Sequence, residues 1–376
     1  MGRCLPSSRS SAGKFEFEQA RALARRGHEV IYCYSDNRSI RENRFLKSFD
    51  MSIDTDGVRV LGSTIPIGGL SYKMLAPIKS AAYKRCLSYL EANQLLPDVA
   101  YIHFPALIGT DSLIDTLDSY AVPFVCMEHW TAVLAKTLSK SRRTLLRRFV
   151  EESARFCCVS EDLARSAADI AGVPCEQLAA IPNAVSSEDF YYDARESLRA
   201  DKRFRFVWSG RIERVKRLDV LIEAFARLDV ESELLIAGDG SAIGQVKTLC
   251  RRLGVEDRVS FLGWKTPSEL GTIYRSCDCF VSASPLETFC VPFAEAWMCG
   301  LPVIGVDSNP LRGYFTEENG IMFESGNVDA LTKSLVRLIN GVSAYDRLGI
   351  ASNALQAFSE KSVISRIETI LLENSK

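Results

Sequence analysis

The stretch Pro285-Leu286-Glu287-Thr288-Phe289-Cys290-Val291-Pro292-Phe293-Ala294-Glu295 decides our interpretation of the fold. It follows the apolar residues 279–282, which predict a buried strand, and it leads into residues 292–299, which predict a helix. Pro292 suits the first turn of that helix, because its missing N–H leaves no hydrogen bond unmade there. A strand, a loop and a helix in this order are typical of a layered α/β domain, in which ligands bind beyond the carboxyl ends of the strands.

Strand-like and helical runs alternate on both sides of this stretch. In the carboxyl-terminal half, strands are expected at residues 206–209, 233–237, 259–262, 279–282 and 302–305, and helices at 218–228, 243–253, 267–275 and 292–299. In the amino-terminal half, a helix is expected at residues 15–26, and strands at 30–34, 99–103, 123–127, 156–159 and 178–181. This alternation predicts an α/β protein with parallel sheets.

The length of the chain predicts two domains, because single cores become inefficient beyond roughly 250–300 residues and this chain has 376. Residues 182–202 are polar and without clear periodicity, which marks them as a linker. We expect one domain over residues 1–185, a second over 186–355, and a final helical segment over 356–376. Residues 328–373 are expected to be helical throughout.

The amino terminus departs from the usual order of an open parallel sheet, in which a strand precedes the first helix. Residues 1–10 are too short and too polar for a good central strand. Either the chain starts late or the first domain has lost this strand. We favour the late start and expect the first strand to be missing.

Composition and charge exclude several classes of protein. Lys plus Arg number 46 and Asp plus Glu 47, so the chain does not bind nucleic acid through bulk positive charge. No run of 18 uncharged apolar residues predicts a membrane span, and the start of the chain lacks the apolar core of a signal peptide. The twelve cysteines are scattered and lack metal-ligand spacing, which favours reduced thiols in a cytoplasmic protein.

Basic residues follow the first predicted strand of the carboxyl-terminal half. Gly210 and Arg211 come directly after this strand, and Lys216 follows five residues later. Arg presents a planar fork of donors and Lys a mobile point charge, a combination that suits a diphosphate. Arg214 and Arg217 lie in the same run, so the alternative is a basic surface segment, and spacing alone favours that alternative.

Two carboxylates flank the start of the helix predicted at residues 292–299. Glu287 lies in the preceding loop and Glu295 in the second turn, so both can face one crevice. The amides of residues 289–293 point past the start of the helix and form an anion site. Because carboxylates suit hydroxyls and repel phosphate, the economical interpretation is a phosphate-linked sugar. A capped helix with two solvated acids is the alternative, and the pattern leaves the two interpretations level.

Taken together, these residues resemble the retaining glycosyltransferases of family four, also called group 1 glycosyl transferases. Glu287 and Glu295, with seven residues between them, are similar to the E-x7-E segment of that family. The resemblance extends over most of the chain, is strongest over residues 183–302, and includes further segments at residues 181–185, 209–211 with Lys216, 237–240, 259–263, and 27–30 with Gly13 ahead of them.

The resemblance implies a GT-B fold, in which two Rossmann-like domains with parallel sheets face a central cleft and the final helix crosses back to the first domain. It also implies a nucleotide-diphosphate sugar as donor, with no metal and no cofactor. Arg211 and Lys216 would neutralise the leaving diphosphate, Glu287 would hold the transferred sugar, and Glu295 would hold the ribose. The other donor-binding residues that the family implies are Gly13, Gly210, Phe289, Cys290 and Val291.

His129 completes the set of catalytic residues that the resemblance implies. It lies at the end of a predicted strand of the first domain and would contact the reacting sugar from the acceptor side. Without the resemblance, a single histidine at such a position is more often structural than catalytic. Gly13 would let the amino-terminal loop approach the phosphates closely.

The sequence departs from the family pattern at three places. Cys290 stands where the family usually has Gly, residues 308–310 replace the usual glycine pair, and Gly13 is the one glycine left of an amino-terminal pair. Together with the doubtful first strand, these departures leave open whether the chain is fully active.

Two other motifs have plainer explanations. Asp54-Thr55-Asp56 is formally the metal-binding DxD of another glycosyltransferase fold, but no clear strand precedes it, so we expect a solvated turn. Residues 238–244 come close to a dinucleotide fingerprint but have one residue too many before the third glycine.

Residues 136–148 form a basic segment with interleaved leucines. Its six basic residues are Lys136, Lys140, Arg142, Arg143, Arg147 and Arg148. Such a segment can rest on an anionic membrane face, and a solvated helix face is at least as good an interpretation of the pattern. The lipid-linked acceptors of the family favour contact with the inner face of the membrane.

The sequence therefore predicts a metal-independent hexosyltransferase that acts on a glycan or lipid-linked acceptor in polysaccharide or glycolipid synthesis. Two alternatives remain: a nucleotide-sugar epimerase or hydrolase on the same fold, and a non-catalytic subunit that binds sugar nucleotides. Cys290 and the missing first strand favour the subunit mildly.

Overall fold

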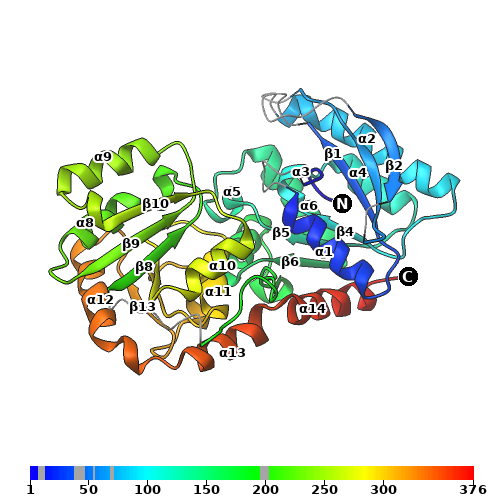
Figure 1. Ribbon diagram of the computed structural model, residues 1–376. Coiled ribbons are helices and arrows are strands. Elements are labelled where there is room, and N and C mark those ends of the chain that lie inside the picture. The colour runs from blue at the N-terminus through cyan, green and yellow to red at the C-terminus, as the bar shows by residue number, and fades with distance from the viewer. Residues whose placement is uncertain (7–12, 38–46, 54–55, 68–71, 195–202) are drawn as a thin grey trace. The chain divides into compact units, whose positions relative to one another are not determined.

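The computed structural model describes residues 1–6, 13–37, 47–53, 56–67, 72–194 and 203–376 (Figure 1). Contacts divide the chain into two compact units. Unit 1 comprises Met1–Pro182 and Val363–Lys376, and unit 2 comprises Asn183–Ser362. For comparison, the sequence places domain boundaries after residues 185 and 355.

Unit 2 is built on a six-stranded parallel sheet. Its strands are β8 (Phe204–Ser209), β9 (Ser232–Ala237), β10 (Val259–Gly263), β11 (Cys279–Val281), β12 (Val303–Val306) and β13 (Gly320–Phe323). They are ordered β10-β9-β8-β11-β12-β13, and every neighbouring pair is parallel. The order reverses between β8 and β11, which is the arrangement of a doubly wound nucleotide-binding sheet.

Helices cover both faces of this sheet. They are α8 (Leu218–Ala226), α9 (Ile243–Leu253), α10 (Pro267–Arg275), α11 (Val291–Met298), α12 (Val328–Gly341) and α13 (Arg347–Phe358). Figure 1 shows α8, α9 and α12 on one side of the strands and α10 and α11 on the other. The first group buries aliphatic side chains against β8 and β9. On the other face, Phe280 of β11 packs edge-on against Phe293 of α11, so the sheet is sandwiched between apolar layers.

Unit 1 contains two sheets. The first has the order β1-β3-β2 and comprises β1 (Ile31–Asp36), β2 (Lys47–Ile53) and β3 (Arg59–Thr64), with β2 antiparallel to β3. The second has the order β4-β5-β6-β7 and is parallel throughout, with β4 (Ala100–His103), β5 (Phe124–Glu128), β6 (Arg155–Cys158) and β7 (Ala179–Ala180).

The first residues of the chain lie between these two sheets. Gly2 forms a single parallel bridge with Tyr34 of β1, and its N–H donates to the Cys33 carbonyl. On the other side, the His103 N–H of β4 donates to the Met1 carbonyl at 3.0 Å. Among the described residues no strand is assigned before α1, but this bridge occupies the place of the central strand, where none was expected from the sequence.

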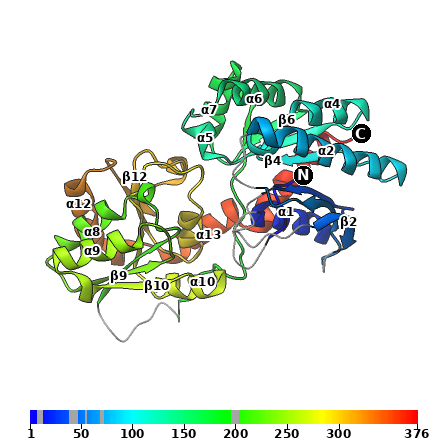
Figure 2. The same cartoon turned by 90° about the horizontal axis from the view of Figure 1, so that it is seen from above.

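The helices of unit 1 are α1 (Lys14–Arg25), α2 (Tyr72–Ala92), α3 (Pro105–Ile108), α4 (Asp111–Ser119), α5 (Thr131–Leu134), α6 (Lys140–Glu152), α7 (Glu161–Ala171) and α14 (Glu360–Glu373). Figure 2 shows α4, α6 and α7 on one side of the strands and α1 on the other. Glu368 of α14 accepts hydrogen bonds from Arg26 and from the His28 ring, and these contacts fasten the last helix beside the end of α1.

Most expectations for single elements are confirmed, and two need correction. The tail is helical, but it is divided into α12, α13 and α14 by breaks near Tyr345 and at Ser359. A strand, β2, does precede the DxD triplet. Asp54 and Thr55 lie outside the described residues, and Asp56 pairs with Arg21 of α1 at 3.0 Å.

All twelve cysteines are free thiols, and eleven of them are buried. None of the helices in the described ranges combines the length and the apolar character that a bilayer crossing requires.

Candidate active site

The reversal of strand order in unit 2 brings two loops together. One loop follows β8 and carries Gly210 and Arg211, and the other follows β11 and carries Glu287. Open α/β sheets bind ligands at the carboxyl ends of the strands where the order reverses. The topology therefore places the predicted diphosphate-binding and sugar-binding loops side by side.

An ion pair joins these two loops. The Lys216 ammonium lies 2.6 Å from a carboxylate oxygen of Glu287, and both side chains are largely buried. Arg211 is exposed. Arg214 donates to Gln245 and Arg217 to Asp219, so these two basic side chains are engaged elsewhere. The basic run is thus divided, and of these four residues only Lys216 pairs with a predicted site residue.

Glycines allow the loops after β8 and β9 to touch. Gly238 has φ +146°, and a Cβ added there would lie 1.9 Å from the Gly210 carbonyl oxygen. The Gly210 N–H donates to Ala237, and the Gly238 N–H donates to Gly263 at the end of β10. This close approach explains the glycine-rich sequence at the end of β9.

Glu295 is linked to the end of β8 through a tyrosine. The Tyr274 hydroxyl is 3.5 Å from a Glu295 carboxylate oxygen and 2.5 Å from the Ser209 hydroxyl. Burial raises the pKa of Tyr274 far above its usual value, and the nearby Glu295 charge raises it further. The phenol therefore remains protonated and can donate to the carboxylate.

Cys290 adopts the left-handed conformation that usually requires glycine, with φ +66° at the N-cap of α11. Its thiol is buried, and burial raises its pKa. Phe289 is also buried and packs against Phe358. Val291 is the first residue of α11.

The amides at the start of α11 are fewer than the sequence suggests. Pro292 has no N–H, and the Phe293 N–H donates to the Cys290 carbonyl at 3.0 Å. Of the three residues 291–293, Val291 therefore offers the amide that can face an anion beyond the helix.

His129 is buried at the end of β5 in unit 1. Its Nε2 lies 3.2 Å from Nδ1 of His103, and its ring stacks on Phe104. Burial lowers the pKa of His129 to about 3, and the charge of Arg3 lowers it further. The ring is therefore neutral at physiological pH and can donate or accept one hydrogen bond at each nitrogen.

Glu128, which the sequence analysis did not single out, holds the loop that carries His129. Its carboxylate accepts from the backbone N–H groups of Ala106, His129 and Trp130 at 3.0, 2.9 and 2.8 Å. The side chain is fully buried, and burial raises its pKa to about 7 against the effect of these hydrogen bonds. A lone acidic residue at the end of an apolar strand is the one sequence signal that could have drawn attention to it.

Gly13 lies at the N-cap of α1 with φ +81°. A Cβ there would lie 2.3 Å from the Cys4 carbonyl oxygen, so only glycine fits between the start of α1 and the first residues of the chain.

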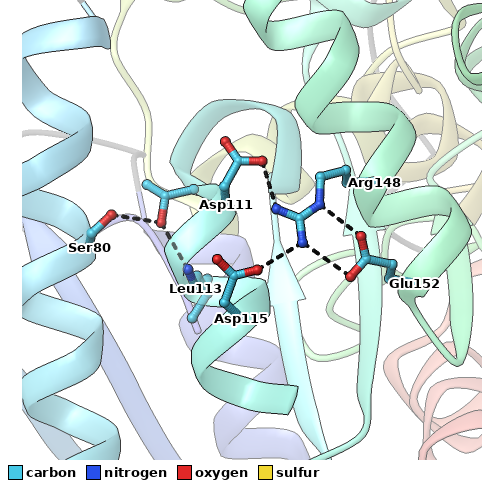
Figure 3. A network of polar contacts seen from close by, with 7 residues as sticks. Ser80, Asp111, Leu113, Asp115, Arg148 and Glu152 are labelled. Carbon is cyan, nitrogen blue, oxygen red and sulfur yellow. Dashed lines mark hydrogen bonds and ion pairs between the residues drawn. The ribbon is translucent and has the colours of Figure 1, made fainter. Parts of the chain in front are cut away.

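Most basic side chains of the segment at residues 136–148 have partners within unit 1, although four of the six are exposed. Lys136 pairs with Asp169, and Arg142 and Arg147 donate to backbone carbonyls. Arg148 of α6 pairs with Asp111 and Asp115 of α4 at 2.9 Å each and with Glu152 at 2.8 Å (Figure 3).

No group of three or more His, Cys, Asp or Glu side chains capable of holding a metal occurs among the residues the structure describes. Within unit 2, Lys216, Glu287, Gly210 and Cys290 belong to the same pair of loops. Gly13 and His129 belong to unit 1.

Two family models match the chain, one for each half. The model described as "Glycosyltransferase Family 4" matches residues 13–189, and the model described as "Glycosyl transferases group 1" matches residues 192–354. Together they extend over both units.

Curated relatives carry the same type of activity in their names. The chain is 22% identical to the N-acetyl-alpha-D-glucosaminyl L-malate synthase of Bacillus anthracis, over 98% of this chain and 94% of that protein. It is 28% identical to the D-inositol 3-phosphate glycosyltransferase of Mycolicibacterium smegmatis, over 50% of this chain and 47% of that protein.

Solved structures share the fold. A sucrose-phosphate synthase from Thermosynechococcus elongatus superposes with a TM-score of 0.77 at 18% identity, over 97% of this chain and 94% of that one. Anabaena Alr3699/HepE, in complex with UDP and glucose, superposes with a TM-score of 0.72 at 16% identity, over 98% of each chain. The expected GT-B fold class is confirmed.

Proposed function

Because this chain belongs to the group 1 glycosyl transferases, with an amino-terminal half of the family 4 type, we propose that it moves a hexosyl unit from a nucleotide-diphosphate sugar to a glycan or lipid-linked acceptor. The transfer would retain the anomeric configuration and need no metal. The observation that carries the proposal is the Lys216–Glu287 pair at the point of unit 2 where the strand order reverses.

The main chemical requirement of the reaction is to stabilise negative charge on the leaving diphosphate. As the glycosidic bond breaks, the diphosphate gains negative charge, and fixed donors aimed at it stabilise the transition state. In this proposal Arg211, Lys216 and the Val291 amide supply those donors. Glu287 binds hydroxyls of the transferred sugar, and Glu295 binds those of the ribose.

The acceptor side of the proposal rests on unit 1. His129, neutral and held in place by Glu128, would contact the reacting sugar, and Gly13 would leave room for the phosphates. No carboxylate is assigned as a covalent nucleophile, so the leaving phosphate itself would take the proton of the acceptor.

The donor is best sought among UDP-sugars, because a structural neighbour of this chain holds UDP and glucose. A nucleoside diphosphate that binds only the folded state raises the melting temperature. We expect UDP to do so in the wild type and much less in Lys216→Ala. If no nucleoside diphosphate stabilises the folded chain, the proposal is wrong.

Transfer is separated from the alternative activities by mass analysis of donor incubated with and without a panel of acceptors. A transferase forms a glycoside only when acceptor is present. An epimerase or hydrolase consumes donor alone, and a non-catalytic subunit binds nucleotide without any turnover.

The cytoplasmic location and the membrane contact of residues 136–148 belong to the same proposal. Because five of the six basic side chains there already have partners within unit 1, we expect binding to anionic vesicles to be weak and to depend on Lys140. Vesicle sedimentation of the wild type against Lys140→Glu tests this part.

A further inference from the structure

Two buried cations of unit 1 have no role in the proposed mechanism. Lys79 of α2 is 9% exposed, and Arg142 of α6 is 8% exposed. Burying a charged side chain is costly unless it is paired. Arg142 donates to the Ala106 carbonyl and its charge interacts with that of Glu128, so Lys79 is the position that requires an explanation.

Lys79 and Arg142 lie close enough for their charges to repel each other, and the helices that carry them both contact the segment from α3 to the start of α4. Arg142 donates from Nη1 to the Ala106 carbonyl at 2.5 Å, and the Ala106 N–H donates to Glu128. At the other end of this connection, the hydroxyl of Ser80, the neighbour of Lys79, donates to Thr110 at 3.0 Å. The helices that carry Lys79 and Arg142 therefore meet at this connection.

The charges around Lys79 do not balance it within the described residues. Arg142 repels it, and Asp36 attracts it from the end of β1, but the Lys79 ammonium forms no hydrogen bond or ion pair with any residue that the structure describes. Burial lowers the pKa of Lys79 to about 8, so the group still carries most of its charge at pH 7.

A second unpartnered donor lies next to Asp36. Asn37 is 7% exposed, and its side-chain nitrogen is buried without a hydrogen-bond partner in the described structure. Its oxygen accepts from Ser35, which fixes the amide with its N–H groups on the other side. Buried N–H groups in native proteins nearly always have a partner, so this amide indicates a ligand.

We propose that Lys79, Arg142 and the Asn37 amide form a subsite for an anionic group of the acceptor, a carboxylate or a phosphate. The inference rests on the proposed function and deepens it, because it states the chemistry that an acceptor must carry. An anion there would compensate the buried charge of Lys79 and lie in the same unit as His129. Either a small soluble acid or the phosphate of a lipid-linked acceptor meets this requirement.

The test uses the full chain saturated with UDP, so that added anions do not bind in the site of unit 2. Melting temperatures are measured with inorganic phosphate, a dicarboxylate such as succinate, and a sugar phosphate, for the wild type, Lys79→Met and Lys84→Met. Lys84 is an exposed lysine of the same helix and serves as the matched control.

We expect at least one soluble anion, or vesicles containing a lipid phosphate, to stabilise the wild type and Lys84→Met. Lys79→Met should lower the affinity for that anion about tenfold or more. Without anions, Lys79→Met should melt at a higher temperature than the wild type, because a buried charge is removed. A lysine with a purely structural role would give the opposite shift. Arg142→Lys keeps the positive charge but loses the planar guanidinium with its paired donors. This variant should bind the anion more weakly while the chain stays folded.

The outcomes distinguish failure of the anion subsite from failure of the proposed transferase activity. Stabilisation by soluble anions points to a small acidic acceptor, and stabilisation by lipid phosphate alone points to a lipid-linked one. If UDP stabilises the chain but no anion does, or if Lys79→Met keeps the full anion effect, the subsite is wrong and the proposed function stands. If UDP has no effect on any variant, the proposed function itself fails.

Discussion

The ammonium of Lys216 and the carboxylate of Glu287 lie 2.6 Å apart, so the group predicted to meet the diphosphate is already paired with the group predicted to meet the sugar. A diphosphate that takes Lys216 as its counter-ion must compete with Glu287. Substitutions of the two residues should therefore have different effects on nucleotide binding and on transfer.

We predict that Glu287→Gln binds UDP at least as tightly as the wild type but loses about 100-fold or more in transfer rate. The substitution removes a negative charge near the diphosphate, and it also removes the acceptor for sugar hydroxyls that is needed in the transition state. Calorimetry of UDP binding and initial rates of transfer measure the two effects. The matched control is Asp219→Asn, because the Asp219 carboxylate pairs with Arg217 on the surface. This variant should change neither UDP binding nor the transfer rate.

Lys216→Ala should lower both the affinity for UDP and the rate of transfer. Loss of one charge-assisted hydrogen bond corresponds to about 10–100-fold in UDP affinity. Equal UDP affinity in the wild type and in folded Lys216→Ala would remove Lys216 from the donor site.

Cys290 allows the cost of its backbone conformation to be measured. We predict that Cys290→Gly is more stable than Cys290→Ala by about 1 kcal/mol, because both variants lose the thiol but only glycine adopts φ +66° without strain. Urea unfolding of the two variants measures the difference. An alanine variant as stable as the glycine variant would contradict the left-handed conformation.

Gly238→Ala should destabilise unit 2 by several kcal/mol, on the order of 3 or more, because its Cβ would lie 1.9 Å from the Gly210 carbonyl oxygen. Gly244→Ala is the matched control. Apart from its chain neighbours and the backbone of its own helix, no atom of the described residues lies within 4 Å of a Cβ at that position in α9, so alanine should be neutral or stabilising there. Thermal unfolding of both variants measures their stability relative to the wild type.

His129 should make the protein sensitive to acid. Its folded pKa of about 3 lies below the usual value of 6.5, so between these pH values the unfolded state binds a proton that the native state does not. Stability therefore falls as the pH falls from 6.5 to 3, by an amount on the order of 4–5 kcal/mol from this residue. His129→Gln should flatten this part of the stability curve. Identical acid curves for the two proteins would show that His129 is not buried in its neutral form.

Five of the six strands of unit 2 could be predicted because they are short apolar runs bounded by loops and helices, whereas β13 was not predicted. The predicted helices at residues 243–253 and 267–275 match α9 and α10 to the residue, since their apolar residues recur at helical spacing. The structure adds a capping box at Thr266 that the sequence analysis did not use. Strand β2 was missed because it is an antiparallel edge strand with a polar sequence, Lys47–Ile53, that lacks a long apolar run.

The site could be predicted only in part. Lys216 and Glu287 were found because a family pattern marks both. Lys79 and Arg142 carry no such pattern, and Arg142 lies in a basic run that is typical of a surface. Their burial arises from packing between α2, α6 and the α3–α4 connection, which is a property of tertiary structure.

Eleven of the twelve cysteines are buried, and Cys175, in the short 3₁₀ helix Cys175–Gln177, is the one with partial exposure. A maleimide dye should therefore attach to the native protein at one defined position without any engineering of the chain. The protein would then be labelled briefly at increasing denaturant concentrations. The mass of the labelled protein would give the number of cysteines that have become reactive. The protein thus carries its own reporter for the order in which its two halves open.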